Sequence, residues 1–172
     1  MGQDKALLSA GPHPLVTDVA AKVAVAAGSV ALVGKPERYG SLGLHCIEDL
    51  RPDLGPLAGI EAALESGRGD VNLIVACDMP GLTTSFLRTL MRQAENTSAP
   101  CVVTRDTSGA IHPLCAVYRG ACLPMIQRAL NARRLRLMDV VEELGATFCD
   151  TGGIVWNVNT PQEWSAWRAN AH

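Results

Sequence analysis

The strongest constraint on the fold comes from the segment VNLIVA at Val71–Ala76, a continuous apolar run in which only Asn72 is polar. A strand with one face in water alternates apolar and polar residues. A continuous run is typical of a parallel strand that is covered on both faces, because both sets of side chains are then buried. Val71–Ala76 therefore predicts a central strand with helices on both sides of its sheet.

The rest of the chain alternates helical and strand patterns. Pro14–Ala27 repeats apolar residues with helical spacing, with Pro14 in the first turn and Gly28 as the stop. Further helices are expected through Ile60 and Leu64 to Gly67, over Thr84–Ala94, Ala121–Ala132 and Arg136–Leu144, and from Thr160 onward. Strands are expected at SVALVG, LHCIED, PCVVTRD, HPLCAVY, ATFCD and IVWNV. This alternation predicts a three-layer α/β domain with a mainly parallel sheet, and we expect one domain over residues 1–172.

Composition excludes several classes of function. Apolar residues make up 48% and charged residues 19% of the chain, as in ordinary globular proteins. The net charge of −2 provides no field for nucleic acid or an anionic membrane, so local groups must hold any anionic ligand. No apolar stretch is long enough to span a membrane, and no export signal is present. The six cysteines form no C-x-x-C pair, which favours free thiols and a cytoplasmic location.

Asp78 is the sharpest candidate for chemistry, since ligands of open α/β sheets bind beyond the carboxyl ends of the strands. It follows the apolar run directly, and Met79-Pro80 then turns the chain away. Asp78 could instead cap the next helix, but Thr83, Thr84 and Ser85 already provide a cap. The functional interpretation is a ligand for Mg²⁺, which takes one or two carboxylates together with substrate phosphates.

Other polar or glycine-rich sites leave two interpretations open. Asp49 ends a short strand and is either solvated or a partner for a ribose or base. The loop after it is either a turn that begins a helix or a backbone segment that approaches a flat ligand closely; its residues are Gly55, Pro56, Leu57, Ala58 and Gly59. Arg105-Asp106 ends a strand, and His112 opens the next one as a ligand, a base or a satisfied strand-end histidine.

The two ends of the chain carry further candidates. Lys5 by itself is most simply a solvated lysine. Asn157 and Asn159 alternate along a predicted strand, so both face the same side and either bind a polar ligand or close a loop. No G-x-S-x-G, H-E-x-x-H or Cys/His arrangement is present, so a hydrolase with a protein nucleophile is unsupported.

The order of these motifs carries more information than any one of them. MGQDKALL, IED followed by GPLAGI, CDMP, HPLCAVY and NVNTPQEW occur in that sequence along nearly the whole chain. In this order they resemble the MobA-like nucleotidyltransferases, and among these the molybdenum cofactor guanylyltransferases. The resemblance implies a Rossmann-like fold of the nucleotide-diphospho-sugar transferase type.

The resemblance also implies a role for each candidate residue. Lys5 matches the lysine that contacts the nucleotide phosphates, and Asp49 matches a nucleotide-binding acid. Gly55–Gly59 matches the loop that approaches the nucleoside. Asp78 matches the aspartate that binds Mg²⁺. Asn157 and Asn159 match a pair on the molybdopterin side of the cleft.

The implied reaction transfers GMP from GTP to molybdopterin-bound molybdenum and releases pyrophosphate. Mg²⁺ and Lys5 would neutralise charge on the triphosphate while the protein holds two anionic groups in line, so no protein nucleophile is needed. The implied partners are GTP, the molybdenum cofactor and, transiently, proteins that deliver or accept that cofactor.

The sequence departs from the family pattern in two places. Family members carry a strand ending in L-A-G-G-x-S-x-R before M-G-x-D-K, whereas here nothing precedes Met1. We therefore expect a sheet with one strand fewer and an incomplete phosphate cradle. Gly34 also stands where guanylyltransferases often have an Asn that holds the base. The alternatives are a molybdopterin cytidylyltransferase or another MobA-like nucleotidyltransferase, and a truncated, non-catalytic relative that binds a nucleotide or a partner protein.

Overall fold

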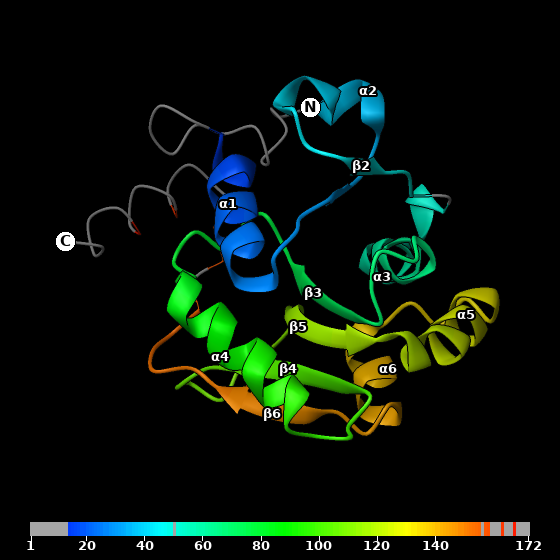
Figure 1. The fold of residues 1–172 in the computed structure, drawn as a ribbon. Helices are drawn as coiled ribbons and strands as arrows, with labels where there is room; N and C mark the ends of the chain where they lie inside the picture. The colour runs from blue at the N-terminus through cyan, green and yellow to red at the C-terminus, as the bar shows by residue number, and fades with distance from the viewer. Residues whose placement is uncertain (1–13, 50, 156, 159–162, 164–166, 168–172) are drawn as a thin grey trace.

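Helices cover both faces of the sheet in the computed structural model, which describes residues 14–49, 51–155, 157, 158, 163 and 167 (Figure 1). The α-helices are α1 (Leu15–Ala27), α2 (Pro36–Tyr39), α3 (Pro56–Glu65), α4 (Thr84–Glu95), α5 (Leu123–Asn131) and α6 (Leu137–Glu143). The strands are β1 (Leu32–Val33), β2 (Cys46–Ile47), β3 (Val71–Val75), β4 (Cys101–Arg105), β5 (Ile111–Arg119) and β6 (Thr147–Asp150). The predicted α/β class is confirmed.

Local signals place several helix ends where the sequence predicts them. Gly28 ends α1 in a left-handed conformation with φ 80°, and its N–H donates to the Ala24 carbonyl at 2.9 Å. Thr83 caps α4, since its Oγ1 accepts from the Phe86 N–H at 3.1 Å. Short 3₁₀ turns complete the chain at Gly40–Leu42, Pro52–Leu54 and Gly120–Cys122.

The strands form two separate sheets. β1 and β2 pair in parallel as a two-stranded sheet, and the other strands form a four-stranded sheet in the order β3-β5-β4-β6. β5 is antiparallel to β3 and to β4, while β6 is parallel to β4. Strands β3, β4 and β6 therefore run in one direction, and β5 is reversed because the short Asp106–Ala110 turn joins it to β4 as a hairpin.

Two hydrophobic clusters occupy opposite faces of the larger sheet. Alternate residues of β4 and β5 point to one face or the other, so Val103 and Tyr118 pack with α3, α5 and α6, whereas Val102 and Val117 pack with α1 and α4. All four of these side chains are at most 1% exposed. The core is thus built around the β4–β5 hairpin.

The strand predicted to be central lies at an edge. Among the described residues β3 pairs with β5 alone and β1 pairs with β2 alone, so the expected single sheet is divided between them. Every residue of β3 is half-buried, although the strand is mostly apolar. A strand becomes fully buried only when it has neighbours in the sheet on both sides, which β3 lacks within this part of the structure.

The carboxyl-terminal predictions have mixed outcomes. The prediction of a strand at IVWNV is wrong for the described residues, because residues 154, 155, 157 and 158 have no strand conformation. They follow β6 as an irregular segment that is held by hydrogen bonds to other loops. The predicted helix start at Thr160 lies outside the described residues, although Glu163 and Trp167 are helical.

All six cysteines are free, as the sequence predicts. In the part of the chain that the structure describes, no helix is both long enough and apolar enough to cross a membrane.

Candidate functional site

A largely apolar cavity of about 400 Å³ lies between the two sheets. Helix α1 contributes Val16 and Ala20 to its wall, α3 contributes Gly59 and Ala63, and Val33 and Val75 line it from β1 and β3. The cavity extends past the end of β3 to Cys77 and Asp78. Among the described lining residues Asp78 is the one carboxylate, and it lies at this end of the cavity.

Asp78 is half-buried in the loop that follows β3. Met79 and Leu82 anchor this loop, since each is at most 5% exposed in the cluster formed with α1 and α4. Lys22 of α1 donates from Nζ to the Pro80 carbonyl at 2.9 Å, and burial lowers the pKa of its ammonium group. The loop is therefore attached to α1 and α4 directly after the aspartate.

The structure brings Asp78 close to one of the two predicted amides. The Val158 N–H donates to the Asp78 carbonyl at 2.8 Å, so the neighbouring residue Asn157, which is exposed, lies on a segment joined directly to the Asp78 loop. The other predicted amide, Asn159, and the predicted phosphate ligand Lys5 lie outside the described residues.

Asp49 lies on the β2 side of the cavity, two residues after the lining residue Ile47. Its Oδ1 accepts from the Arg51 N–H at 2.9 Å, and the Arg51 guanidinium is paired with Glu61 of α3, with 3.1 Å between Nε and Oε2. Glu61 is 4% exposed, and burial raises the pKa of its carboxyl while Arg51 opposes that rise. The ion pair thus holds the Asp49 loop against α3.

The Gly55–Gly59 segment begins α3, as the turn interpretation predicts. Gly55 precedes the helix with φ 71°, a conformation that favours glycine, and Pro56 is the first helical residue. The side chains of Leu57 and Ala58 are buried in the core at 0% and 1% exposure, which leaves only their backbone toward any ligand. A Cβ at Gly59 would meet Val33 Cγ1 at 3.8 Å, an ordinary contact, so the protein alone does not require glycine there.

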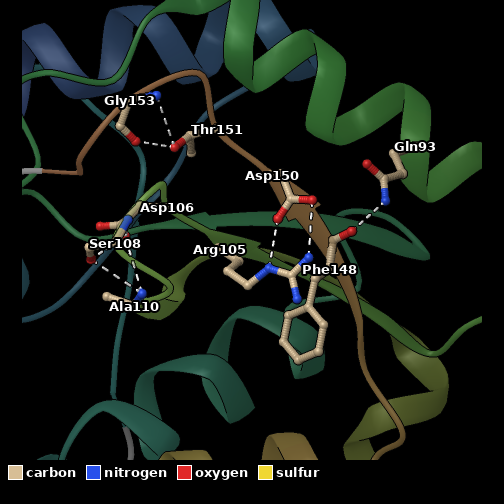
Figure 2. Close-up of polar contacts among 9 residues, drawn as sticks. All are labelled: Gln93, Arg105, Asp106, Ser108, Ala110, Phe148, Asp150, Thr151 and Gly153. Carbon is tan, nitrogen blue, oxygen red and sulfur yellow. Dashed lines mark hydrogen bonds and ion pairs between the residues drawn. The ribbon is translucent and has the colours of Figure 1, made fainter.

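Asp106, which lies in the β4–β5 turn, is a buried acid with a dense set of partners (Figure 2). Its Oδ1 accepts from the Ser108 N–H at 2.8 Å, from Ser108 Oγ at 2.6 Å and from the Ala110 N–H at 3.1 Å. Its Oδ2 lies 3.0 Å from His112 Nε2 and accepts from the Val155 N–H at 3.3 Å. The Ser108 hydroxyl first, and then His112, hold the pKa of the Asp106 carboxyl well below its usual range.

Beside this turn, an exposed ion pair joins β4 to β6. Arg105 binds Asp150 through two hydrogen bonds of 2.7 and 3.1 Å and lies over the Phe148 ring, with 5.2 Å between its guanidinium carbon and the ring centroid (Figure 2). Gln93 of α4 donates to the Phe148 carbonyl at 2.7 Å. Exposed pairs contribute little free energy, so we interpret this group as alignment of the sheet edge.

Sequence reasoning missed the network of Arg51 and Glu61, and it weighed Asp106 and His112 only as strand-end residues. The interpretation of His112 as a strand-end histidine whose hydrogen bonding is satisfied within the protein agrees with its buried contact to Asp106. The sequence D-x-S-G does signal a turn that the aspartate closes, because Asp side chains bind backbone two residues ahead. No local signal marks Glu61 as a partner of Arg51.

Asp78 thus lies beside the cavity and beyond the carboxyl end of β3, which is where ligands bind in open α/β folds. Residues 1–147 match the family described as "MobA-like NTP transferase domain", and the chain belongs to that family.

Individual relatives and one solved structure extend this result. The chain is 34% identical, over 95% of its own length and 83% of the relative's, to a "Probable molybdenum cofactor guanylyltransferase" of Pelotomaculum thermopropionicum. It is 30% identical to the "Molybdenum cofactor guanylyltransferase" of Xanthomonas euvesicatoria pv. vesicatoria, over 96% and 86% of the two lengths. The crystal structure of molybdopterin-guanine dinucleotide biosynthesis protein A from Archaeoglobus fulgidus matches with a TM-score of 0.81 at 19% identity, over 99% and 91% of the chains, and it supports the fold alone.

Proposed function

We propose that this chain is a molybdenum cofactor guanylyltransferase, which transfers GMP from GTP to molybdopterin-bound molybdenum and releases pyrophosphate. The names of relatives that are 34% and 30% identical over most of the chain support this activity. The observation that carries it is the position of Asp78, at the end of β3 and joined through its carbonyl to the segment that bears Asn157. A nucleotide on the Asp78 loop and a second anionic substrate beside Asn157 would then meet at one place.

The donor set fits Mg²⁺. Within the described residues no group of three or more His, Cys, Asp or Glu side chains could hold a metal ion. Mg²⁺ does not need such a group, because one or two carboxylates and the phosphates of the substrate complete its octahedron. Asp78 would be the protein ligand, and the bound ion would supply neutralisation of charge on the triphosphate.

The chain's own residues would mainly position the substrates. In the proposed reaction the terminal phosphate of molybdopterin forms a bond to the α-phosphorus of GTP while the bond to pyrophosphate breaks. Asp49 and the backbone of Gly55–Gly59 would hold the nucleoside, Lys5 would contact the phosphates, and Asn157 and Asn159 would hold the molybdopterin side. Holding the two anions in line supplies much of the rate enhancement that such a transfer needs.

Gly34 provides no side-chain amide for a guanine base. A Cβ built at Gly34 would lie 2.7 Å from Tyr39 Cε2 and 2.9 Å from Cδ2, so an asparagine does not fit there unless Tyr39 moves. Transfer of CMP from CTP, as a molybdopterin cytidylyltransferase, is the alternative, and nucleotide preference tests it.

The test is turnover of GTP or CTP with molybdopterin by the wild-type chain and by Asp78→Asn, measured as dinucleotide formed by chromatography. Asp70→Asn is the matched control, because Asp70 is exposed and precedes the same strand at its other end. Asp78→Asn should lose Mg²⁺-dependent transfer by at least about 10²-fold while Asp70→Asn keeps it. Wild-type turnover by Asp78→Asn would contradict the metal assignment. Nucleotide binding without any turnover by the wild type would favour the non-catalytic relative.

We also propose a cytoplasmic location and transient contacts with proteins that deliver or accept the cofactor. The six free cysteines support the location, since free thiols persist in reducing compartments.

A further inference from the structure

Asp106 is a buried acid with no role in the proposed transfer. It is 6% exposed, and its neighbour His112 is 7% exposed. Burying an ionised carboxylate costs free energy unless several donors compensate it. The Asp106–Ala110 turn by itself occupies only Oδ1, through Ser108 and Ala110. The second oxygen, Oδ2, therefore has a function beyond closing the turn.

Oδ2 reaches a segment that is distant in sequence. It accepts from the Val155 N–H at 3.3 Å, across 49 positions of the chain, and it lies 3.0 Å from His112 Nε2 on the neighbouring strand. The histidine, which is itself buried, holds the carboxylate from the β5 side. Asp106 thus connects the β4–β5 hairpin to the irregular segment after β6.

The described residues of that segment, 151–155, 157 and 158, are attached at several points. The Thr151 N–H donates to the Arg105 carbonyl at 2.9 Å, and the Thr107 N–H donates to the Gly153 carbonyl at 3.4 Å. Val155 is bound by Asp106, and the Val158 N–H donates to the Asp78 carbonyl at 2.8 Å. Among the described residues, the Asp106–Val155 bond lies between the Gly153 contact and the Val158 contact with the Asp78 loop.

The segment has room to move if that attachment is lost. A second cavity, of about 260 Å³, is lined by residues 151–155 together with Gly81, Leu82, Thr83 and Phe86. Val155 packs partly against the cluster formed with α1 and α4, and Val158 is 2% exposed, so packing also holds this end of the segment. The Asp106–Val155 bond adds a polar constraint from the side of the β4–β5 turn.

We infer that Asp106 is a positioning residue, whose second carboxylate oxygen holds residues 151–158 so that Asn157 stays beside the Asp78 loop. This inference rests on the proposed function, in which Asn157 contacts the molybdopterin side. Asp106 touches no substrate in this account. It acts by fixing the segment that does.

Asp106→Asn keeps the turn and changes the contacts of Oδ2, which are the bond from Val155 and the contact with His112 Nε2. An asparagine keeps an oxygen for the turn, where Asn and Asp are both favoured, but its amide NH₂ then faces the Val155 N–H with a donor in place of an acceptor. Asp150→Asn is the matched control: it makes the same change in the adjacent exposed ion pair with Arg105 and leaves Val155 untouched.

Two readouts separate positioning from general destabilisation. Because Asn157 would no longer be held beside the Asp78 loop, the KM for molybdopterin should rise by at least about tenfold in Asp106→Asn, with the dissociation constant for GTP unchanged. Amide hydrogen exchange at Val155 and Val158 should become faster in Asp106→Asn and stay slow in Asp150→Asn.

Each outcome supports or overturns the inference. A wild-type KM for molybdopterin with Val158 still protected would overturn it while leaving the proposed function intact. Equal weakening of GTP and molybdopterin binding together with a loss of stability would also overturn it, because that is general destabilisation. If wild-type turnover is absent, the proposed function fails, and amide exchange still tests the attachment. If Asp106→Asn does not fold, Val155→Pro removes the same donor from the other side and should produce the same exchange at Val158.

Discussion

Strands β3 and β5 carry similarly apolar sequences, yet they are buried to different degrees. Residues Cys115–Tyr118 of β5 are at most 1% exposed, whereas every residue of β3 is half-buried. β5 has a strand on each side and helices on both faces, while β3, among the described residues, pairs with β5 alone and borders the 400 Å³ cavity. The comparison teaches that an apolar sequence selects the strand conformation, but neighbours decide how much surface is removed from water.

A buried carboxylate lies in each of these regions, and the two are shifted in opposite directions. Asp106 receives several hydrogen bonds on both oxygens, and its carboxyl pKa falls. Glu61 lies on α3, which lines the cavity, and burial raises its carboxyl pKa. Within the described residues it forms one ion pair, with Arg51, and its buried Oε1 has no hydrogen-bond partner. Burial raises the pKa of both carboxyls, and the number of hydrogen-bond donors decides whether the net shift is downward, as in Asp106, or upward, as in Glu61.

The largest expected effect is on packing. Leu87 is 0% exposed in the hydrophobic cluster between the larger sheet and helices α1 and α4, and Leu87→Ala should reduce the free energy of unfolding by about 2–5 kcal/mol. Leu73→Ala, in half-buried β3, should cost at most about half as much, because part of its surface already borders the cavity. Urea denaturation of both variants measures the difference. Equal losses of unfolding free energy would show that β3 is as well packed as the cluster around Leu87.

The next effect should come from Asp106→Ala, which leaves the Ser108, Ala110 and Val155 donors without their acceptor. Because its folded pKa lies below the unfolded value of about 3.9, the carboxylate stabilises the fold above that pH, and the contribution is lost as the pH falls. The variant should therefore be less stable at pH 7, and the gap to the wild type should narrow toward pH 3. Urea titrations across this range measure it, and a constant gap would contradict the prediction.

Glu61→Gln should show the opposite pH dependence. The folded pKa of Glu61 is raised, so its relative contribution is present below the unfolded pKa of about 4.3 and is lost as the pH rises. At pH 7 we expect a change of about 1 kcal/mol or less, since removing a buried charge offsets the lost pairing with Arg51. The free energy of unfolding of the variant should fall relative to that of the wild type as the pH falls from 7 to 4. A shift in the same direction as Asp106→Ala would break the contrast between the two carboxylates.

The smallest effect should come from filling the cavity. Ala20 lines the cavity, whereas the next residue, Ala21, is exposed on the same helix. Ala20→Leu should raise the free energy of unfolding by about 0.5–1 kcal/mol through new apolar contacts. Ala21→Leu should stay within about 0.5 kcal/mol of the wild type. If thermal unfolding shows both variants equally stable, or Ala20→Leu less stable, the cavity lacks the room that its lining implies.

The elements themselves were largely predictable. Gly28, Thr83 and Pro56 begin or end helices where the pattern places them, because capping and backbone preference act within one turn. The hairpin around Ser108-Gly109 was predictable for the same reason. The irregular course of residues 154–158 was not, since these residues bond to Asp106 and Asp78, and period-two alternation carries no record of such partners.

By itself, the sequence determined the α/β class, the position of Asp78 after an apolar strand, and the order of motifs that marks the family. Only the tertiary structure decided that β3 is an edge strand among the described residues, that Arg51 pairs with Glu61, and that Asp106 holds Val155. The physical reason is the distance along the chain over which each effect acts. Backbone preferences and periodicity are set by residues a few positions apart, whereas burial and the pKa of a buried acid depend on groups that only folding brings together.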